Sequence, residues 1–216
     1  NPRLVSAWSW ESAYLLNKTN LNNSIKKLQI LHYKWEPEFL MDYFPEEYLP
    51  MFREAYFSDM IKIAISRTQL DDFKNVKIYH WLQGINTHKF FYKKDNNKKT
   101  LQILIPLRNP RVKGAIYVIH AAEIIHNSNK NLRIVSYGNY SGEIPKFIQH
   151  LGIVDFLNLI KLYRESDIFI LPSLSEGFSY PGLEAMASGC AVISTKNGGS
   201  DQYIIDGFNG LLVEKK

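Results

Sequence analysis

Short apolar runs alternate with stretches of helical periodicity along most of the chain, and this alternation limits the possible folds more than any other feature of the sequence. The runs with the length and composition of strands are Lys27–Tyr33, Ile61–Ser66, Val76–Tyr79, Leu101–Pro106, Leu132–Ser136, Ile168–Leu171 and Ala191–Ser194. Continuous apolar strands separated by helices are typical of parallel sheets that helices cover on both faces. We therefore predict an α/β protein built on parallel sheets.

Two of the helices expected between these strands have distinct patterns. The helix after Lys113 carries a core-facing apolar stripe at three-residue spacing, formed by Ile116, Ile119, Ala122 and Ile125. A second helix is expected from Pro45, with Glu46 and Glu47 in the first turn, where the helix dipole favours acidic residues. It lies in an aromatic-rich stretch, residues 35–57, that either packs into the core with an aromatic edge or forms a surface for an acceptor or a membrane.

The composition is that of a soluble globular protein. With 216 residues, 45% of them hydrophobic and 22% charged, the chain can form one large domain or two small ones. Its formal charge of +5 comes mostly from residues 1–99, but acidic residues are interspersed throughout. The excess therefore argues against a nucleic-acid-binding tail, and it suits a phosphate-bearing ligand or a peripheral contact with an anionic membrane.

The cysteine content and the lengths of the apolar segments indicate the compartment. Cys190 is the single cysteine, which excludes a disulfide framework or a thiolate zinc site within the chain. No run reaches the roughly 18 apolar residues of a spanning helix, and residues 1–20 lack the apolar middle of a signal peptide. We expect a cytoplasmic protein, soluble or peripheral at the inner membrane face. Because the chain begins at Asn1 rather than at methionine, we also expect a fragment that lacks material at both ends.

A polar, charged run without periodicity, residues 93–99, marks a loop between two structural units. We place the domain boundary near residue 90. This gives a partial N-terminal domain over residues 1–90 and a C-terminal domain over residues 91–216.

The stretch from residue 171 to residue 194 has the most features that are typical of a ligand site. An apolar strand ends at Leu171, a loop with Glu176 and Gly177 follows, and a helix is expected to begin near Pro181. Ligands of open α/β sheets bind at the carboxyl ends of the strands. Free backbone N–H groups at the start of the helix, over residues 178–180, suit phosphate or sugar oxygens.

Two glutamates of this stretch have a spacing that bears on the chemistry. Glu176 lies in the loop and Glu184 in the helix, so a rise of about 1.5 Å per residue separates them by roughly 10 Å. That is wide for the carboxylate pair of a glycosidase, which needs roughly 5–9.5 Å. It suits two carboxylates that hold different ends of one extended ligand. Alternatively, Glu184 lies on a solvated helix face.

Two other strand ends carry candidate ligand contacts. Arg108 and Lys113 follow the strand Leu101–Pro106 and offer a forked donor and a point charge for a diphosphate, although basic residues in loops are more often simply solvated. Gly138 follows the strand Leu132–Ser136. It either allows a backbone to approach a ligand closely or is a plain turn glycine.

The segment from Glu176 to Glu184, with Gly177, Phe178 and Pro181, followed by Ala-Met-Ala-Ser-Gly, resembles the donor-site signature of glycosyltransferase family 4, the group 1 transferases of GT-B fold. The resemblance continues through residues 198–199 and 206–213, extends back through residues 162–167, and covers residues 100–216. It implies two Rossmann-like domains, the first incomplete in this chain. Residues 1–90 would be the acceptor side, and residues 91–216 would bind the donor and lack their last helices.

The resemblance also implies an activity, which is transfer of a sugar from a nucleotide diphosphate-sugar to a glycan or lipid-linked acceptor, with retention of configuration. It implies catalytic roles for Glu176, Arg108 and Lys113. The implied donor-binding residues are Gly138, Gly177, Phe178, Ser179, Tyr180 and Glu184. Leu107 replaces the family's usual glycine before the arginine. No cofactor or metal is expected, because the sequence has no Asp-x-Asp motif and its histidines lack metal-ligand spacing.

The likeness is looser before residue 90. His32 and Glu36 follow an expected strand and are candidates for the acceptor side, although a lone histidine at a strand end is more often structural. Two other functions compete with transfer. One is a nucleotide-sugar-processing enzyme of similar fold, such as an epimerase or phosphorylase, for which the sequence has no supporting motif. The other is a catalytically inactive nucleotide-sugar-binding or scaffolding module.

Overall fold

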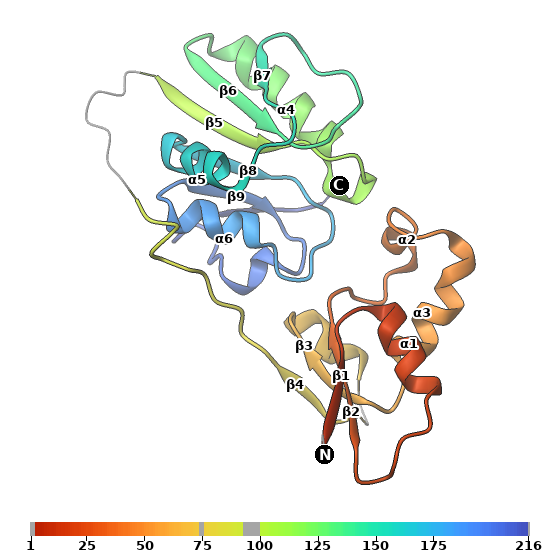
Figure 1. Ribbon diagram of the computed structural model, residues 1–216. Helices are drawn as coiled ribbons and strands as arrows, with labels where there is room; N and C mark the ends of the chain where they lie inside the picture. Colours follow the sequence, from red (N-terminus) through yellow and green to blue (C-terminus); the bar gives the residue numbers. More distant parts are fainter. Residues whose placement is uncertain (1–2, 74–75, 93–99, 216) are drawn as a thin grey trace. The chain divides into compact units, whose positions relative to one another are not determined.

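The computed structural model describes residues 3–73, 76–92 and 100–215, and the chain divides into two compact units, residues 1–83 and 84–216 (Figure 1). The division falls before the boundary expected near residue 90, because Ile85 and Phe90 pack in the core of the second unit. The polar run over residues 93–99, from which that boundary was inferred, lies outside the described residues.

The first unit is a parallel four-stranded sheet with helices. Its elements are β1 (Leu4–Ala7), α1 (Trp10–Lys18), β2 (Lys26–Leu31), α2 (Pro37–Leu40), α3 (Leu49–Tyr56), β3 (Ile61–Ala64) and β4 (Ile78–His80). The strand order is β1-β2-β3-β4, and every pairing is parallel. The expected strands that correspond to β2, β3 and β4 are confirmed with shifted ends. The strand β1 was not expected, because its four residues are too few to show a period against the serines and tryptophans that follow.

The aromatic-rich stretch of the first unit packs into its core. The helix expected from Pro45 begins as a 3-10 turn, Glu46–Tyr48, and continues as α3. Phe52 and Tyr56 of α3 are buried, with 3% and 1% of their surface exposed. Phe52 contacts the rings of several other aromatic residues, Trp10, Tyr33, Trp35, Phe44 and Tyr56. The core-facing interpretation of this helix is therefore confirmed.

The side chain of Lys62, which belongs to β3, is fully buried. Its Nζ donates hydrogen bonds to Gln29 Oε1 at 2.6 Å, to Ser58 Oγ at 2.7 Å and to the carbonyl oxygen of Ala55 at 3.2 Å. All three acceptors are neutral, and burial disfavours the charged amine, so the pKa of Lys62 falls to about 7, with a smaller opposing effect of Asp59.

The second unit is a six-stranded parallel sheet covered on both faces. Its elements are β5 (Leu101–Pro106), α4 (Ala115–Ser128), β6 (Leu132–Tyr137), β7 (Ile148–His150), α5 (Phe156–Glu165), β8 (Ile168–Leu171), α6 (Tyr180–Ala187), β9 (Ala191–Thr195) and β10 (Leu211–Val213). Short 3-10 turns cover Arg111–Lys113 and Ser200–Gln202. The expected strands β5 and β8 are confirmed at both ends, and β6 and β9 within one residue. None of the helices in the described ranges is long and apolar enough to cross a membrane.

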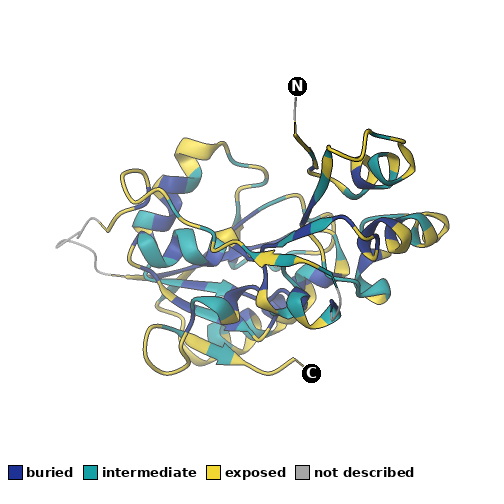
Figure 2. Ribbon diagram, turned by 90° about the horizontal axis from the view of Figure 1, so that it is seen from below, coloured by how far each residue is buried: buried dark blue, intermediate teal, exposed yellow. Residues whose placement is uncertain are grey.

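The side chains of β5 alternate between the two faces of this sheet, as a period of two requires. Ile103 and Ile105 pack with α4 on one face, whereas Leu104 packs with α5 and α6 on the other. Both faces are apolar, which explains why β5 has no polar alternation in its sequence. Figure 2 shows buried residues along the strands and exposed residues on the outer helix faces.

The strand order β10-β9-β8-β5-β6-β7 creates a switch point at the centre of the sheet. The chain runs from β5 outward to β6 and β7, returns to β8 beside β5, and then runs outward in the opposite direction to β9 and β10. The loops that follow β5 and β8 therefore start side by side and lead to opposite halves of the sheet. Ligands of open α/β sheets bind at the carboxyl end of such a point.

We expect the stability of the first unit to rise with pH because of Lys62. In the folded protein Lys62 loses its proton near pH 7, whereas in the unfolded chain it keeps its proton up to its ordinary pKa of 10.5. The unfolded chain thus binds more protons over this interval, so the free energy of unfolding should increase by a few kcal/mol (~2–4) between about pH 7 and about pH 9.5.

Urea unfolding followed by tryptophan fluorescence measures this dependence, because all four tryptophans lie in residues 1–83. The Lys62→Met variant should lose most of the rise. An equal rise in both proteins would show that Lys62 is not its source.

Candidate functional site

The loops that follow β5 and β8 are locked together at the carboxyl edge of the second sheet. Gly114, between the 3-10 turn and α4, has φ +68°, and a Cβ there would lie 2.1 Å from the carbonyl oxygen of Pro172. Beside this contact, the backbone N–H of Leu174 donates to the carbonyl oxygen of Val112 at 2.7 Å. Only glycine allows both the left-handed conformation and this close approach. These two contacts, which we call the lock between the loops, hold Lys113 beside the start of the loop after β8.

Lys113 and Glu176 form an ion pair across these loops. Lys113 Nζ lies 2.8 Å from Glu176 Oε1, and only 14% and 15% of the two side chains is exposed. The pair lines a small cavity whose remaining walls are Pro106, Arg108, Leu171, Ser173 and Pro181. The structure thus brings Arg108 and Lys113, which follow β5, together with Glu176, which follows β8.

Glu184 of α6 is half-buried rather than fully solvated. The hydroxyl of Tyr163 donates to Glu184 Oε2 at 3.1 Å, and the hydroxyls of Tyr137 and Tyr163 lie 3.2 Å apart. Burial raises the pKa of Glu184, and the hydrogen bond from Tyr163 and the charge of Arg108 oppose this rise. Burial likewise raises the pKa of Tyr137 to about 12, and Arg108 opposes that rise too. Arg108 therefore acts electrostatically on both Tyr137 and Glu184.

The segment before α6 offers backbone donors. Of the residues that the structure describes with φ between +20° and +160°, Ser179 is the one that is not a glycine (φ 70°, ψ 63°). Within the described part of the chain, the backbone N–H groups of residues 177–179 meet no acceptor. The ring of Phe178 is buried against Tyr180 and Tyr203, so this residue would meet a ligand through its backbone. The helix begins at Tyr180, one residue before the expected start.

Gly138 has a structural reason to be glycine. Its φ is +126°, and a Cβ would lie 2.0 Å from the carbonyl oxygen of Leu107. Leu107 itself is fully buried with α4, and its backbone N–H donates to the carbonyl oxygen of Tyr137 at 2.7 Å. Leucine fits at this position because its backbone does not adopt the left-handed conformation.

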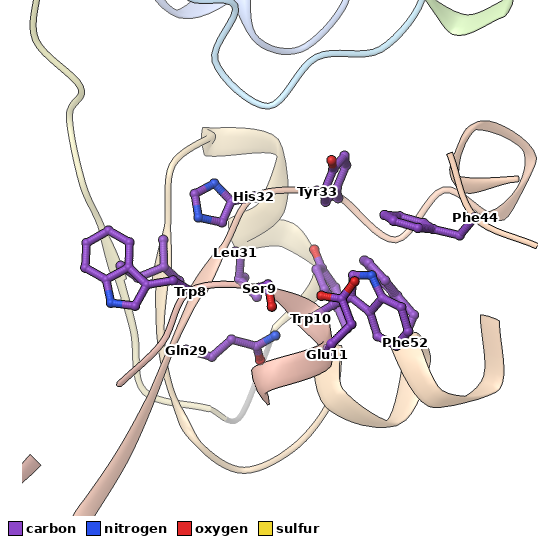
Figure 3. A pocket seen from close by; sticks show the side chains of 12 residues that line it. Trp8, Ser9, Trp10, Glu11, Gln29, Leu31, His32, Tyr33, Phe44 and Phe52 are labelled. Atoms are coloured by element: carbon purple, nitrogen blue, oxygen red, sulfur yellow. The ribbon is translucent and has the colours of Figure 1, made fainter. Parts of the chain in front are cut away.

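A pocket of about 400 Å³ opens in the first unit at the carboxyl ends of β1 and β2. Trp10, Phe44 and Phe52 lie on one side, with Trp8 and His32 on the other (Figure 3). Desolvation lowers the pKa of His32, which favours the neutral imidazole.

Of the two acceptor-side candidates, only His32 is among the residues that line this pocket. Glu36 lies at the start of α2, with its carboxylate 3.6 Å from Lys34 Nζ.

No three His, Cys, Asp or Glu side chains within residues 3–73, 76–92 and 100–215 are close enough to form a metal site.

Comparisons with known proteins place this site in a family. The family model for "Glycosyl transferases group 1" matches residues 86–216. The chain belongs to the group 1 glycosyltransferases. A D-inositol 3-phosphate glycosyltransferase of Paenarthrobacter aurescens is 31% identical over 130 residues, covering 53% of this chain and 32% of that protein. The chain spans about a third of the length of the curated relatives it matches.

Two solved structures show the same fold as this group 1 glycosyltransferase. The C-terminal domain of a group 1 family glycosyl transferase from Francisella tularensis is 31% identical with a TM-score of 0.54, covering 62% of this chain and 81% of that one. An Anabaena protein in complex with UDP-glucose is 16% identical with a TM-score of 0.78, covering 98% of this chain and 65% of that one. The fold is therefore of GT-B type, with two Rossmann-like units.

Three residues at this edge of the sheet were not singled out from the sequence. Tyr163 contacts Glu184, the backbone N–H of Glu176 donates to the carbonyl oxygen of Asn197 at 3.0 Å, and Tyr203 donates to the carbonyl oxygen of Ser179 at 2.7 Å. Asn197 follows β9 at the same edge as the other loops, which was a usable signal. Tyr163 and Tyr203 occur within helical and turn patterns where tyrosine carries no distinguishing signal.

We expect Gly114→Ala to destabilise the second unit more than Gly152→Ala. Both glycines have φ +68°, but a Cβ at Gly152 would meet nothing within 4 Å. Gly152→Ala should therefore cost only the left-handed strain of about 1–2 kcal/mol. Gly114→Ala should cost about 1–3 kcal/mol more, because the new methyl group is forced against Pro172. Calorimetric melting of both variants makes the comparison, and equal losses would contradict the lock between the two loops.

Proposed function

We propose that this group 1 glycosyltransferase moves a sugar from a nucleotide diphosphate-sugar to a glycan or lipid-linked acceptor, without a metal and with retention of configuration, as in family 4. The observation that carries the proposal is the convergence of Arg108, Lys113, Glu176 and the backbone donors of residues 177–179 at the central switch point of the second sheet. Cationic side chains and free N–H groups at such an edge suit a diphosphate.

The diphosphate would lie between Arg108, Lys113 and the start of α6. As the bond between sugar and phosphate breaks, negative charge grows on the departing diphosphate. The contacts between the loops place Lys113 beside this site beforehand, so its ammonium would stabilise the charge with little reorganisation of the backbone. Arg108, Lys113 and the backbone N–H groups supply the electrostatic work that a divalent cation does in other transferases, which is the basis for proposing transfer without a metal.

The two glutamates would hold opposite ends of the donor. Glu176 reaches the cavity beside Lys113 and would accept hydrogen bonds from the sugar hydroxyls. Glu184 is held from one side by the hydroxyl of Tyr163 and would take the ribose. Burial raises the pKa of Glu184, and at such a half-buried position a hydrogen bond to a ribose hydroxyl is worth more than in solvent.

The pocket of the first unit would receive the acceptor. Its aromatic walls and its polar groups, among them His32 and Glu11, have the composition of a site that holds a small ligand by apolar contact and orients it by a few hydrogen bonds. In retaining transfer the acceptor oxygen attacks from the face that the diphosphate leaves, so no protein nucleophile is required. The basic excess of residues 1–99 would favour a peripheral contact with an anionic membrane if the acceptor is lipid-linked.

Binding of nucleoside diphosphates tests the donor site directly. We expect UDP, ADP or GDP to bind the chain in titration calorimetry with EDTA present, and Arg108→Ala and Lys113→Ala each to weaken that binding by about 1–3 kcal/mol, because each removes a charge-assisted contact. Arg133→Ala, whose guanidinium pairs with Gln149 on the exposed edge, is the matched control.

Unchanged affinity in both site variants would show that the diphosphate does not bind at this edge. Binding that EDTA abolishes and magnesium restores would contradict the metal-free proposal.

The two glutamates should differ in what they bind. Glu184→Ala should weaken bare nucleoside diphosphate and intact donor alike, since the ribose is common to both. Glu176→Ala should not weaken bare nucleoside diphosphate, because it removes a carboxylate that competes with the diphosphate for Lys113. It should lower the rate at which nucleoside diphosphate is released from the nucleotide-sugar by one to several factors of ten, each about 1.4 kcal/mol of lost transition-state stabilisation.

Calorimetry and a nucleotide-release assay on both variants separate these roles. If Glu176→Ala lost bare diphosphate affinity as severely as Glu184→Ala, or released nucleotide at the original rate, the assignment would be wrong. Diphosphate binding by the unaltered protein with no turnover of any donor would favour an inactive binding module.

A further inference from the structure

The donor loop, residues 176–179, is held from outside by a second segment, residues 197–203, which follows β9. The carbonyl oxygen of Asn197 accepts from the backbone N–H of Glu176 at 3.0 Å. The side-chain amide of Gln202 donates to the carbonyl oxygen of Gly177 at 3.1 Å, and the hydroxyl of Tyr203 donates to the carbonyl oxygen of Ser179 at 2.7 Å. These three contacts therefore support the donor loop along its whole length, from Glu176 to Ser179.

Ser179 is where this loop departs from ordinary backbone geometry. Its left-handed conformation is one that residues with a Cβ rarely adopt, and such strain persists only where surrounding contacts impose it. The side chain of Ser179 does not provide such a contact, because its Oγ is buried and has no hydrogen-bond partner in the described part of the chain. The hydrogen bond from Tyr203 to its carbonyl oxygen, in contrast, acts directly on the Ser179 backbone.

The hydroxyl of Tyr203 reaches Ser179 through space that the missing side chain of Gly182 leaves open. A Cβ at Gly182 of α6 would lie 2.4 Å from this hydroxyl, so a larger residue would push it away. The ring of Tyr203 is fixed as well, since it packs on Phe178 with the ring centroids 5.6 Å apart. Both ends of the tyrosine side chain are thus held where the hydroxyl meets the strained residue.

We infer that Tyr203 is a positioning residue of the donor site, whose hydroxyl holds Ser179 in the left-handed conformation so that the backbone N–H groups of the donor loop face the diphosphate. The inference rests on the proposed function for its ligand and assigns to Tyr203 no contact with that ligand. It explains why serine can occupy a position whose backbone conformation favours glycine: the contact from Tyr203 replaces the conformational freedom that glycine would provide.

The test is a cycle of Tyr203→Phe, Ser179→Gly and the double variant, with titration of UDP, ADP and GDP. Tyr203→Phe keeps the ring packing and should weaken nucleoside diphosphate binding about three- to tenfold, the range for losing one hydrogen bond. In the Ser179→Gly background the same change should have an effect of less than about twofold, because glycine adopts the left-handed conformation without help. Arg133→Ala removes a side-chain hydrogen bond to Gln149, outside the donor loop and the segment that supports it, and should leave binding unchanged.

The rescue by glycine separates positioning from a general loss of stability, which Ser179→Gly would not repair. Equal losses in both backgrounds, or no loss in either, would overturn the inference.

If the unaltered protein binds none of the three nucleotides, the proposed function fails, and amide hydrogen exchange of the unliganded protein still decides the role of Tyr203. Tyr203→Phe should then speed exchange over residues 177–183, and Ser179→Gly should reduce that increase. Unchanged exchange in Tyr203→Phe would overturn the inference independently of any ligand.

Discussion

The pairing of β5 with β8 is the constraint on which the rest of the second unit depends. These strands are far apart in the sequence, and their contact at Ile103 and Leu104 divides the parallel sheet into two halves, to which the chain adds strands outward in opposite directions. Because both strands are parallel, their loops leave the same edge side by side. Gly114 lets the two loops touch at Pro172, and this contact brings Lys113 and Glu176 together. The chemistry of the site is thus a consequence of strand order before it is a consequence of any single side chain.

Two opposite charges at this edge, Lys113 and Glu176, are paired with each other before a ligand arrives. A nearly buried ammonium or carboxylate is costly unless it is paired, and the Lys113–Glu176 ion pair satisfies both. An incoming diphosphate would replace the carboxylate as the partner of Lys113, which leaves Glu176 available for the hydroxyls of a sugar. The diphosphate and the sugar of one donor would therefore both bind at the Lys113–Glu176 ion pair. The first unit handles a buried lysine differently, because Lys62 has only neutral acceptors and therefore tends to lose its proton.

The sequence predicted the regular elements of the second unit closely and its irregular contacts poorly. The strands β5 and β8 were predicted at both ends, because short, continuous apolar runs that end at polar residues or proline are typical of buried parallel strands. Glu184 was left open between a solvated and a ligand-facing position, since helical spacing alone does not reveal that Tyr163 lies beside it. The reason that Gly138 must be glycine was also hidden, because it depends on the carbonyl oxygen of Leu107 in the loop after β5. Sequence reasoning succeeds where the pattern is local. It fails where the role of a residue depends on contacts from another segment of the chain.

The departures from local rules gather at the edge where the donor would bind, and this is itself an argument about the molecule. A left-handed serine, two glycines in close contact with neighbouring backbone and a nearly buried ion pair all lie in loops at the carboxyl ends of the strands. Strain of this kind persists only where neighbouring contacts impose it, and functional sites are where it concentrates. Here the neighbouring contacts can be named: Pro172 beside Gly114, Leu107 beside Gly138 and Tyr203 beside Ser179. Each comes from a loop after a different strand, so the edge is held rigid by contacts between loops, while the regular sheet below only brings those loops within reach of one another.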